Sequence, residues 1–353
     1  MFMPPSSEPK SRSSPKSFSY LCGEFVQKSF INIHRSFMRL SRHFFVFAAL
    51  LSFFALPTDA QLLWKISGNG LTKPSYMLGS VHLVPSHFID SIYGLRAVMA
   101  EVEQWYGEVV TTDTTVNSVT PDKTVLELPK DMLLKDFYTK EEQERINHFN
   151  YRLTNFEEFE DDVLCLYKGD TPGRALNDLV MLHSQMHNIE LVFDSIPKIM
   201  FDTNFELDAI KNGKPVGALD DAELHRKVVS NGYYSSHKPL KKQAKNLLSF
   251  VDHYAEINYT SYDLMYRYHS QDMNLINNAK TVKENNKNYR KMKELSPQGR
   301  NMIWAKKMPA IMADKSTLFV VGVNHLGNPN TEKRGLIQLL RKAGYTVEPV
   351  RKD

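Results

Sequence analysis

Ser316-Thr-Leu-Phe-Val-Val-Gly-Val-Asn-His325 reads as a buried β-strand that runs directly into a Gly-x-x-His motif at Gly322–His325. The continuous apolar run is typical of a strand that is covered on both faces of a sheet. The same order occurs near the start of the chain, where Ser75-Tyr-Met-Leu78 runs into Gly79-Ser-Val-His82. Each motif therefore predicts a histidine at the carboxyl end of a buried strand.

The segments that follow the two motifs share one pattern. After His82, apolar residues at helical spacing predict a helix over Ile89–Trp105 and then a short strand at Glu108-Val-Val110. After His325, we expect a helix over Gly335–Ala343 and a strand over Thr346–Val350. Two related units with the order strand, loop, helix, strand predict an α/β fold, in which helices flank a central sheet.

A mainly helical region joins the two units. Residues 130–300 have amphipathic stretches, including Gly173–Ile189 and Asp194–Lys211, the second of them interrupted at Pro197. Lys214–Leu219 is a predicted strand within this region. We therefore expect a single α/β domain over residues 61–353 with a helical insertion at about 130–300.

The first sixty residues form a long N-terminal extension with the composition of an export signal. Basic residues after Met38 lead into an apolar run over Phe44–Leu56, and small residues precede Gln61. This pattern predicts a secretory signal peptide that starts at Met38 and is cleaved after Ala60. The apolar run has thirteen residues, and crossing a bilayer takes about 20. We therefore expect a periplasmic or secreted protein with no stable membrane span.

Charge and cysteine content narrow the possible partners. The whole chain carries a net charge of +4, and residues 1–60 account for all of it. The mature chain is thus about neutral, which argues against a nucleic-acid partner. Only Cys22 and Cys165 occur, so the mature chain has one thiol, no internal disulfide and a core that must supply its stability. We expect that thiol to be buried.

His82 and His325 are the main candidates for chemistry. A glycine permits a tight turn or close backbone approach, and ligands bind at the carboxyl ends of strands in open α/β sheets. Two histidines plus one carboxylate are a frequent metal set that leaves positions for water and substrate. Glu108 is the candidate carboxylate, since we expect it to emerge beside the strand that leads to His82.

Other chemistries have weaker support. His183 and His187 are four residues apart on a predicted helix, with Glu190 nearby, but Ser184 stands where a His-Glu-x-x-His metalloprotease would carry its glutamate. We interpret this pair as structural. The sequence contains no Gly-x-Ser-x-Gly elbow, P-loop or Cys-x-x-Cys pair, so a serine hydrolase and a nucleotide enzyme are unsupported.

Taken together, these motifs resemble the TraB/GumN family, which includes the TIKI proteins, metal-dependent proteases that act on Wnt ligands. The resemblance covers nearly all of residues 61–350. It rests on six blocks: Trp64–Ile66, Tyr76–Leu83, Gly107–Val110, Gly213–Leu219, Arg300–Ala305 and Phe319–Gly327 through Gly344–Val350.

The resemblance implies that both Gly-x-x-His motifs reach one centre that binds manganese, cobalt or zinc. It makes His82 and His325 the metal ligands or their neighbours, Glu108 a ligand or general base, and Arg300 and Asn301 the polar support. After the strand at Gly213–Leu219 the family usually has Glu followed by Thr. This chain has Asp220-Asp221 instead, and Asp220 keeps a carboxylate with a shorter reach.

Three functions are compatible with these features. The first is an exported metal-dependent hydrolase, specifically a TIKI-like metallopeptidase that acts on a peptide or protein substrate. The second is a non-catalytic metal- or ligand-binding protein of the cell envelope, because a fold does not fix a function. The third is an accessory factor for surface polysaccharide or conjugation. Metal content and peptide cleavage distinguish the first two.

Overall fold

The two strands that lead into the Gly-x-x-His motifs, β2 (Ser75–Ser80) and β5 (Thr317–Gly322), are parallel neighbours in the computed structural model. Every residue of β2 is buried, and five of the six residues of β5 are buried. Their register pairs Gly79 with Val321 and Ser80 with Gly322. Because the strands are parallel, both motifs leave the sheet at the same edge.

Six strands form one mixed sheet in the order β4-β3-β5-β2-β1-β6. On one side of the central pair, β3 (Gln104–Gly107) and β4 (Val216–Ala218) continue the parallel arrangement. On the other side, β1 (Leu63–Ser67) is antiparallel to both β2 and β6 (Thr346–Pro349). The predicted α/β fold is confirmed.

The segment after His82 differs from the prediction. The expected helix over residues 89–105 is divided into a 3₁₀ helix, η1 (Ser86–Ser91), and a short helix, α2 (Leu95–Glu101). Gly94, between them, has a φ of 75°, which glycine adopts without steric cost. The chain is extended from Val102, so the strand begins at Gln104 and the strand expected at 108–110 is wrong.

Helices α9 (Phe201–Lys211), α15 (Pro297–Asp314), α16 (Val323–Leu326) and α17 (Leu336–Lys342) belong to the sheet region. Contacts join α9 to β3 and β5, α16 to β2 and β5, and α17 to β6 and α15. One continuous cluster of buried apolar side chains includes residues of the sheet and of these helices. The main core is therefore assembled around β2 and β5.

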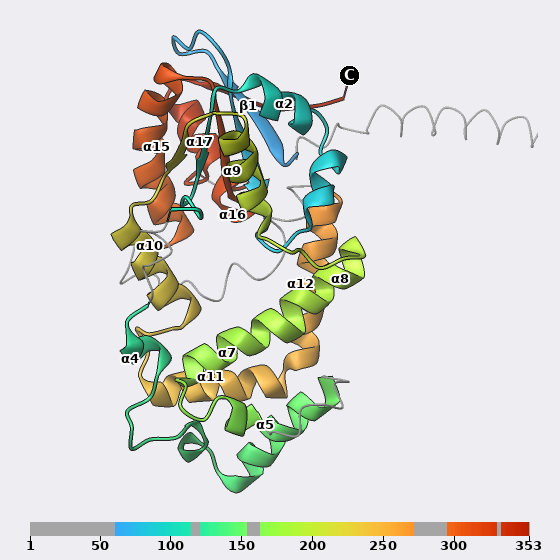
Figure 1. The fold of residues 1–353 in the computed structure, drawn as a ribbon, viewed down its shortest axis with the longest axis vertical. Helices are drawn as coiled ribbons and strands as arrows, with labels where there is room; N and C mark the ends of the chain where they lie inside the picture. The colour runs from blue at the N-terminus through green and yellow to red at the C-terminus, as the bar shows by residue number, and fades with distance from the viewer. Residues whose placement is uncertain (1–60, 114–120, 154–162, 272–294, 330–332, 353) are drawn as a thin grey trace, which may run out of the picture. The chain divides into compact units, whose positions relative to one another are not determined.

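A second cluster of buried apolar side chains lies among helices of the middle region. It includes residues of α5 (Lys140–Leu153), α7 (Pro172–Leu179) and α11 (Leu240–Asp252), and α11 contacts both of the others (Figure 1). Not all of residues 130–300 belongs to this cluster, because α9 and β4 join the sheet. The remaining described elements are α4 (Lys123–Leu126), η2 (Leu134–Phe137), α6 (Val163–Leu166), the π-helices η3 (Val180–Met186) and η4 (Val229–Tyr233), α8 (His187–Phe193), α10 (Ala222–Val228) and α12 (Tyr254–His269).

The structure describes residues 61–113, 121–153, 163–271, 295–329 and 333–352. The expected signal peptide, with its start at Met38 and cleavage after Ala60, lies outside the described residues. Within the described ranges, no helix combines the length and the apolar character that crossing a membrane requires. Cys165, expected to be buried, is exposed.

Candidate functional site

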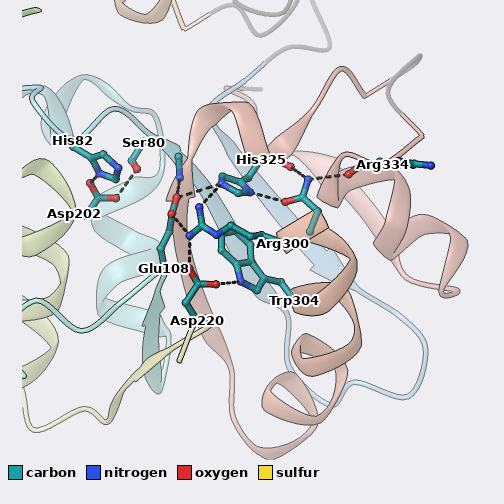
Figure 2. Close-up of polar contacts among 11 residues, drawn as sticks. Ser80, His82, Glu108, Asp202, Asp220, Arg300, Trp304, His325 and Arg334 are labelled. Carbon is teal, nitrogen blue, oxygen red and sulfur yellow. Dashed lines mark hydrogen bonds and ion pairs between the residues drawn. The ribbon is translucent and has the colours of Figure 1, made fainter. Parts of the chain in front are cut away.

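His82 lies in the loop that follows β2, and a carboxylate from α9 holds its ring (Figure 2). Nδ1 of His82 lies 2.6 Å from Oδ2 of Asp202. The other oxygen, Oδ1, accepts a hydrogen bond from the Ser80 hydroxyl at 2.5 Å. The charge of Asp202 raises the pKa of His82 from 6.5 to about 9.

His325 lies in α16, the short helix that follows β5, and a neutral amide from α15 holds its ring. Nδ1 of His325 lies 2.6 Å from Oδ1 of Asn301. The Asn301 amide nitrogen donates to the carbonyls of His325 and Arg334. The imidazole stacks on Trp304 at a centroid distance of 4.3 Å. Burial lowers the pKa of His325 to about 4, so this imidazole is neutral at pH 7.

Glu108 directly follows β3 and reaches the second motif. Its Oε1 accepts a hydrogen bond from the backbone N–H of Gly322 at 2.7 Å and lies 3.7 Å from Nε2 of His325. We expected Glu108 to emerge beside the strand that leads to His82. This expectation is wrong, because β5 lies between β3 and β2. The strand order therefore places Glu108 next to His325 rather than next to His82.

Arg300 joins the two carboxylates of the centre. Its Nη2 lies 2.5 Å from Oε2 of Glu108 and 2.6 Å from Oδ2 of Asp220. Nη1 lies 3.3 Å from Nε2 of His325. The second oxygen of Asp220 accepts a hydrogen bond from the indole N–H of Trp304. Asp220 therefore serves the centre through Arg300, as Figure 2 shows. The predicted supporting residues Asp220, Arg300 and Asn301 all lie around His325.

The carboxylates respond differently to this environment. Burial works to raise the pKa of Glu108, but the neighbouring His325 and the Arg300 guanidinium outweigh it and hold this pKa well below its usual value. Burial raises the pKa of Asp220, and Arg300 only partly offsets that rise. Glu108 is therefore the permanently charged member of the centre.

The glycines of the two motifs are needed for close packing. A Cβ on Gly79 would lie 2.7 Å from Cδ1 of Leu326 and 3.0 Å from Cγ2 of Val323. A Cβ on Gly322 would lie 3.1 Å from Oε1 of Glu108. The first glycine lets α16 pack on β2, and the second makes room for the Glu108 carboxylate.

One family of known proteins matches most of the chain. The sequence model of the TraB/PrgY/gumN family matches residues 62–349. The chain belongs to the TraB/PrgY/gumN family. A search of curated proteins and a search of solved structures found no match.

The donor chemistry of this TraB/PrgY/gumN centre suits a divalent transition-metal ion. It offers two imidazoles, each with Nδ1 already engaged by a side-chain oxygen, and one ionised carboxylate. Glu108 Oε1 and His325 Nε2, 3.7 Å apart, fit as adjacent ligands. Within the part of the chain that the structure describes, no three His, Cys, Asp or Glu side chains stand close enough to enclose an ion. His82 is the member set apart from the pair.

Sequence reasoning missed several residues of the centre. Asp202 lies 120 residues from His82 in the chain, and nothing in a polar helix distinguishes it. Trp304 stood in a block used for the resemblance, but its contacts with Asp220 and His325 could not be foreseen. His225 of α10, which the sequence did not bring forward as a site residue, is half-buried, and the charges of Asp220 and Glu108 act on it.

Glu206, one turn after Asp202 on α9, was also missed. Its buried carboxylate accepts hydrogen bonds from the backbone N–H and hydroxyl groups of Thr111 and Thr112. These threonines belong to the loop that leaves Glu108. Helix α9 therefore anchors the first motif through Asp202 and the Glu108 loop through Glu206.

Proposed function

We propose that this member of the TraB/PrgY/gumN family is a metal-dependent hydrolase that acts on a peptide or protein substrate. The observation that carries the proposal is that the two motif histidines are held in the same way. In both, a side-chain oxygen engages Nδ1, at 2.6 Å from Asp202 and 2.6 Å from Asn301. Metal-binding histidines have this arrangement, because the outer partner fixes the tautomer and the ring.

His82, Glu108 and His325 would hold the ion, which would be manganese, cobalt or zinc. A divalent cation at this place would polarise a substrate carbonyl and make water more acidic. His325 is neutral at pH 7 and can donate its Nε2 lone pair without first losing a proton. The closest pair of donors, Glu108 and His325, supports shared ligation.

Glu108 is better suited to be a ligand than a general base. An effective general base has a pKa near the operating pH, whereas the pKa of Glu108 is held well below its usual value. Arg300 and the Gly322 amide fix the carboxylate and supply its hydrogen bonds. We therefore assign to Glu108 the role of a charged ligand, kept in place by Arg300.

The test combines metal content with peptide cleavage. Purified protein is stripped with EDTA and reloaded in turn with Mn²⁺, Co²⁺ and Zn²⁺. Each form is then assayed on a peptide library together with His82→Ala, His325→Ala and the control His148→Ala, an exposed histidine of α5. We expect one bound ion per chain and cleavage that both motif variants lose and the control keeps. Bound metal without metal-dependent cleavage would leave a non-catalytic binding protein, and no bound metal would refute the proposal.

We also propose that the protein works outside the cytoplasm, in the periplasm or secreted beyond it. The support is the order of a basic region, an apolar stretch of thirteen residues broken only by Ser52, and small residues up to Ala60. N-terminal sequencing of the protein from the exported fraction should give Gln61 as the first residue. A cytoplasmic product that retains Phe44–Leu56 would contradict the proposal.

A further inference from the structure

Asp202 is a buried carboxylate that belongs to neither motif. It lies in the first turn of α9, and its side chain is 12% exposed. Both of its oxygens point at the first motif, one to Nδ1 of His82 and the other to the Ser80 hydroxyl. A buried carboxylate is costly unless its oxygens are hydrogen-bonded, and here both are. The fold therefore fixes this acid against His82.

The backbone beside Asp202 holds the same histidine. The N–H of Phe201 donates to the carbonyl of His82 at 2.7 Å. From α12, the hydroxyl of Tyr268, fully buried, donates to the carbonyl of Gly79 at 2.9 Å. The loop of the first motif is thus held at three places, namely the His82 ring, the His82 carbonyl and the Gly79 carbonyl. These contacts come from helices that lie between the two motifs in the sequence.

The order of these contacts excludes a serine triad. In a triad the histidine lies between the serine and the acid and takes the hydroxyl proton. Here Asp202 lies between Ser80 and His82, so the Ser80 hydroxyl donates its hydrogen bond to the carboxylate and not to the imidazole. Ser80 instead stops the carboxylate from rotating away from the imidazole.

We propose that Asp202 is the positioning residue of the metal centre, which selects the His82 tautomer that carries its proton on Nδ1. A carboxylate can only accept at Nδ1, so the lone pair of the neutral ring lies on Nε2, the atom available to a metal ion. The inference rests on the proposed function. The partners of the two histidines also differ in charge, since the neutral amide of Asn301 holds His325 and the charged carboxylate of Asp202 holds His82.

The test measures Co²⁺ binding by calorimetry and by visible absorption, which reports the donor atoms around the ion. EDTA-treated wild type is compared with Asp202→Ala and Asp202→Asn. The control is Asp90→Asn, which makes the same change in an exposed ion pair with Arg96. Thermal melts followed by circular dichroism identify variants that fail to fold.

Loss of an outer partner typically weakens metal affinity 10–100-fold. We expect a loss in that range for Asp202→Ala, with a changed Co²⁺ spectrum. We expect a smaller but measurable loss, about two- to tenfold, for Asp202→Asn, because its amide oxygen can still accept from Nδ1 but the full negative charge is gone. Such rescue by the conservative variant is not expected of a residue that only stabilises the fold.

Two failures can be told apart. If wild type binds no Co²⁺, the proposed metal centre falls, and the inference falls with it. If wild type binds and Asp202→Ala matches it within twofold, the inference alone is overturned. Should Asp202→Ala not fold, Asp202→Asn decides, since an affinity and spectrum equal to those of wild type would overturn the inference and a measurable loss would support it.

Discussion

Nη2 of Arg300 lies 2.6 Å from Oδ2 of Asp220, and both side chains are almost fully buried. The same nitrogen lies 2.5 Å from Glu108, so one guanidinium group is shared by two carboxylates from different strand ends. Its other face lies over Trp304 at 4.5 Å. Arg300 thus connects helix α15 with the ends of β3 and β4.

Removal of this guanidinium should be strongly destabilising. Arg300→Met leaves Glu108 and Asp220 buried without a counter-charge, and breaking a buried ion pair costs about 3–5 kcal/mol. Arg300→Lys should cost less, because a point charge remains although it cannot bridge two carboxylates. Urea denaturation measures both. Arg96→Met, at an exposed ion pair, is the control, and equal losses at the two positions would contradict the interpretation.

Gly79→Ala should destabilise the sheet region by about 1–3 kcal/mol, the typical cost of an added methyl group in a packed core. Its Cβ would meet Leu326 and Val323 of α16, one contact being with the Val323 backbone at 3.2 Å. The measurement is the free energy of unfolding in urea. A variant as stable as wild type would show that α16 shifts freely on β2.

Gly322→Ala should act on the centre and hardly on stability. The φ of Gly322 is −51°, which alanine adopts without strain, so the free energy of unfolding should change by less than about 1 kcal/mol. Its Cβ would press on Oε1 of Glu108 at 3.1 Å and displace a proposed ligand. Calorimetry should show weaker Co²⁺ binding than in wild type, and unchanged affinity would count against Glu108 as a ligand.

Asn301→Ala should destabilise the fold by about 1–3 kcal/mol, because it leaves buried polar groups without partners. The groups concerned are Nδ1 of His325 and the carbonyls of His325 and Arg334 to which Asn301 donates. Urea denaturation measures the loss. Asn212→Ala, at an exposed position at the end of α9, should stay within about 0.5 kcal/mol of wild type. A similar small effect at Asn301 would refute the prediction.

The stability of the metal-free protein should depend on the His82–Asp202 pair above neutral pH. The pKa of His82 is raised from 6.5 to about 9, so the pair contributes fully below pH 6.5 and its contribution is lost as the pH rises through about 9. The His82 side chain is 41% exposed, which limits the effect to about 1 kcal/mol. Urea midpoints between pH 6 and 10 should fall more for wild type than for Asp202→Asn. Parallel curves would contradict this linkage.

Periodicity and turn chemistry were sufficient to predict the strands that matter most. β2, β4, β5 and β6 fall where their apolar patterns placed them, because each is a short apolar run bounded by glycine or polar residues. β3 was misplaced because Trp105 fits a helix face and a strand equally well in a local pattern. Only the tertiary pairing of Gln104–Gly107 with β5 decides between them.

Only those residues of the centre that lie in or beside a recognisable motif could be proposed from the sequence. His82, His325 and Glu108 were found from their places beside glycines and strand ends, but their partners were not. Strand order cannot be inferred from local sequence, so the position of Glu108 beside β5 was missed. Asp202 comes from a helix with no motif, and only the packing of α9 near the sheet brings it to His82.

The position of β5 between β3 and β2 determines when the centre can assemble during synthesis of the chain. Translation delivers His82 early and His325 about 243 residues later, after the entire helical middle region. Until Thr317–Gly322 enters the sheet, β2 and β3 have no common neighbour, and Glu108 lacks the Gly322 amide. Any polypeptide shortened before β5 therefore lacks His325 and the Gly322 amide, so the centre around His325 cannot assemble even when Glu108 and Arg300 are present.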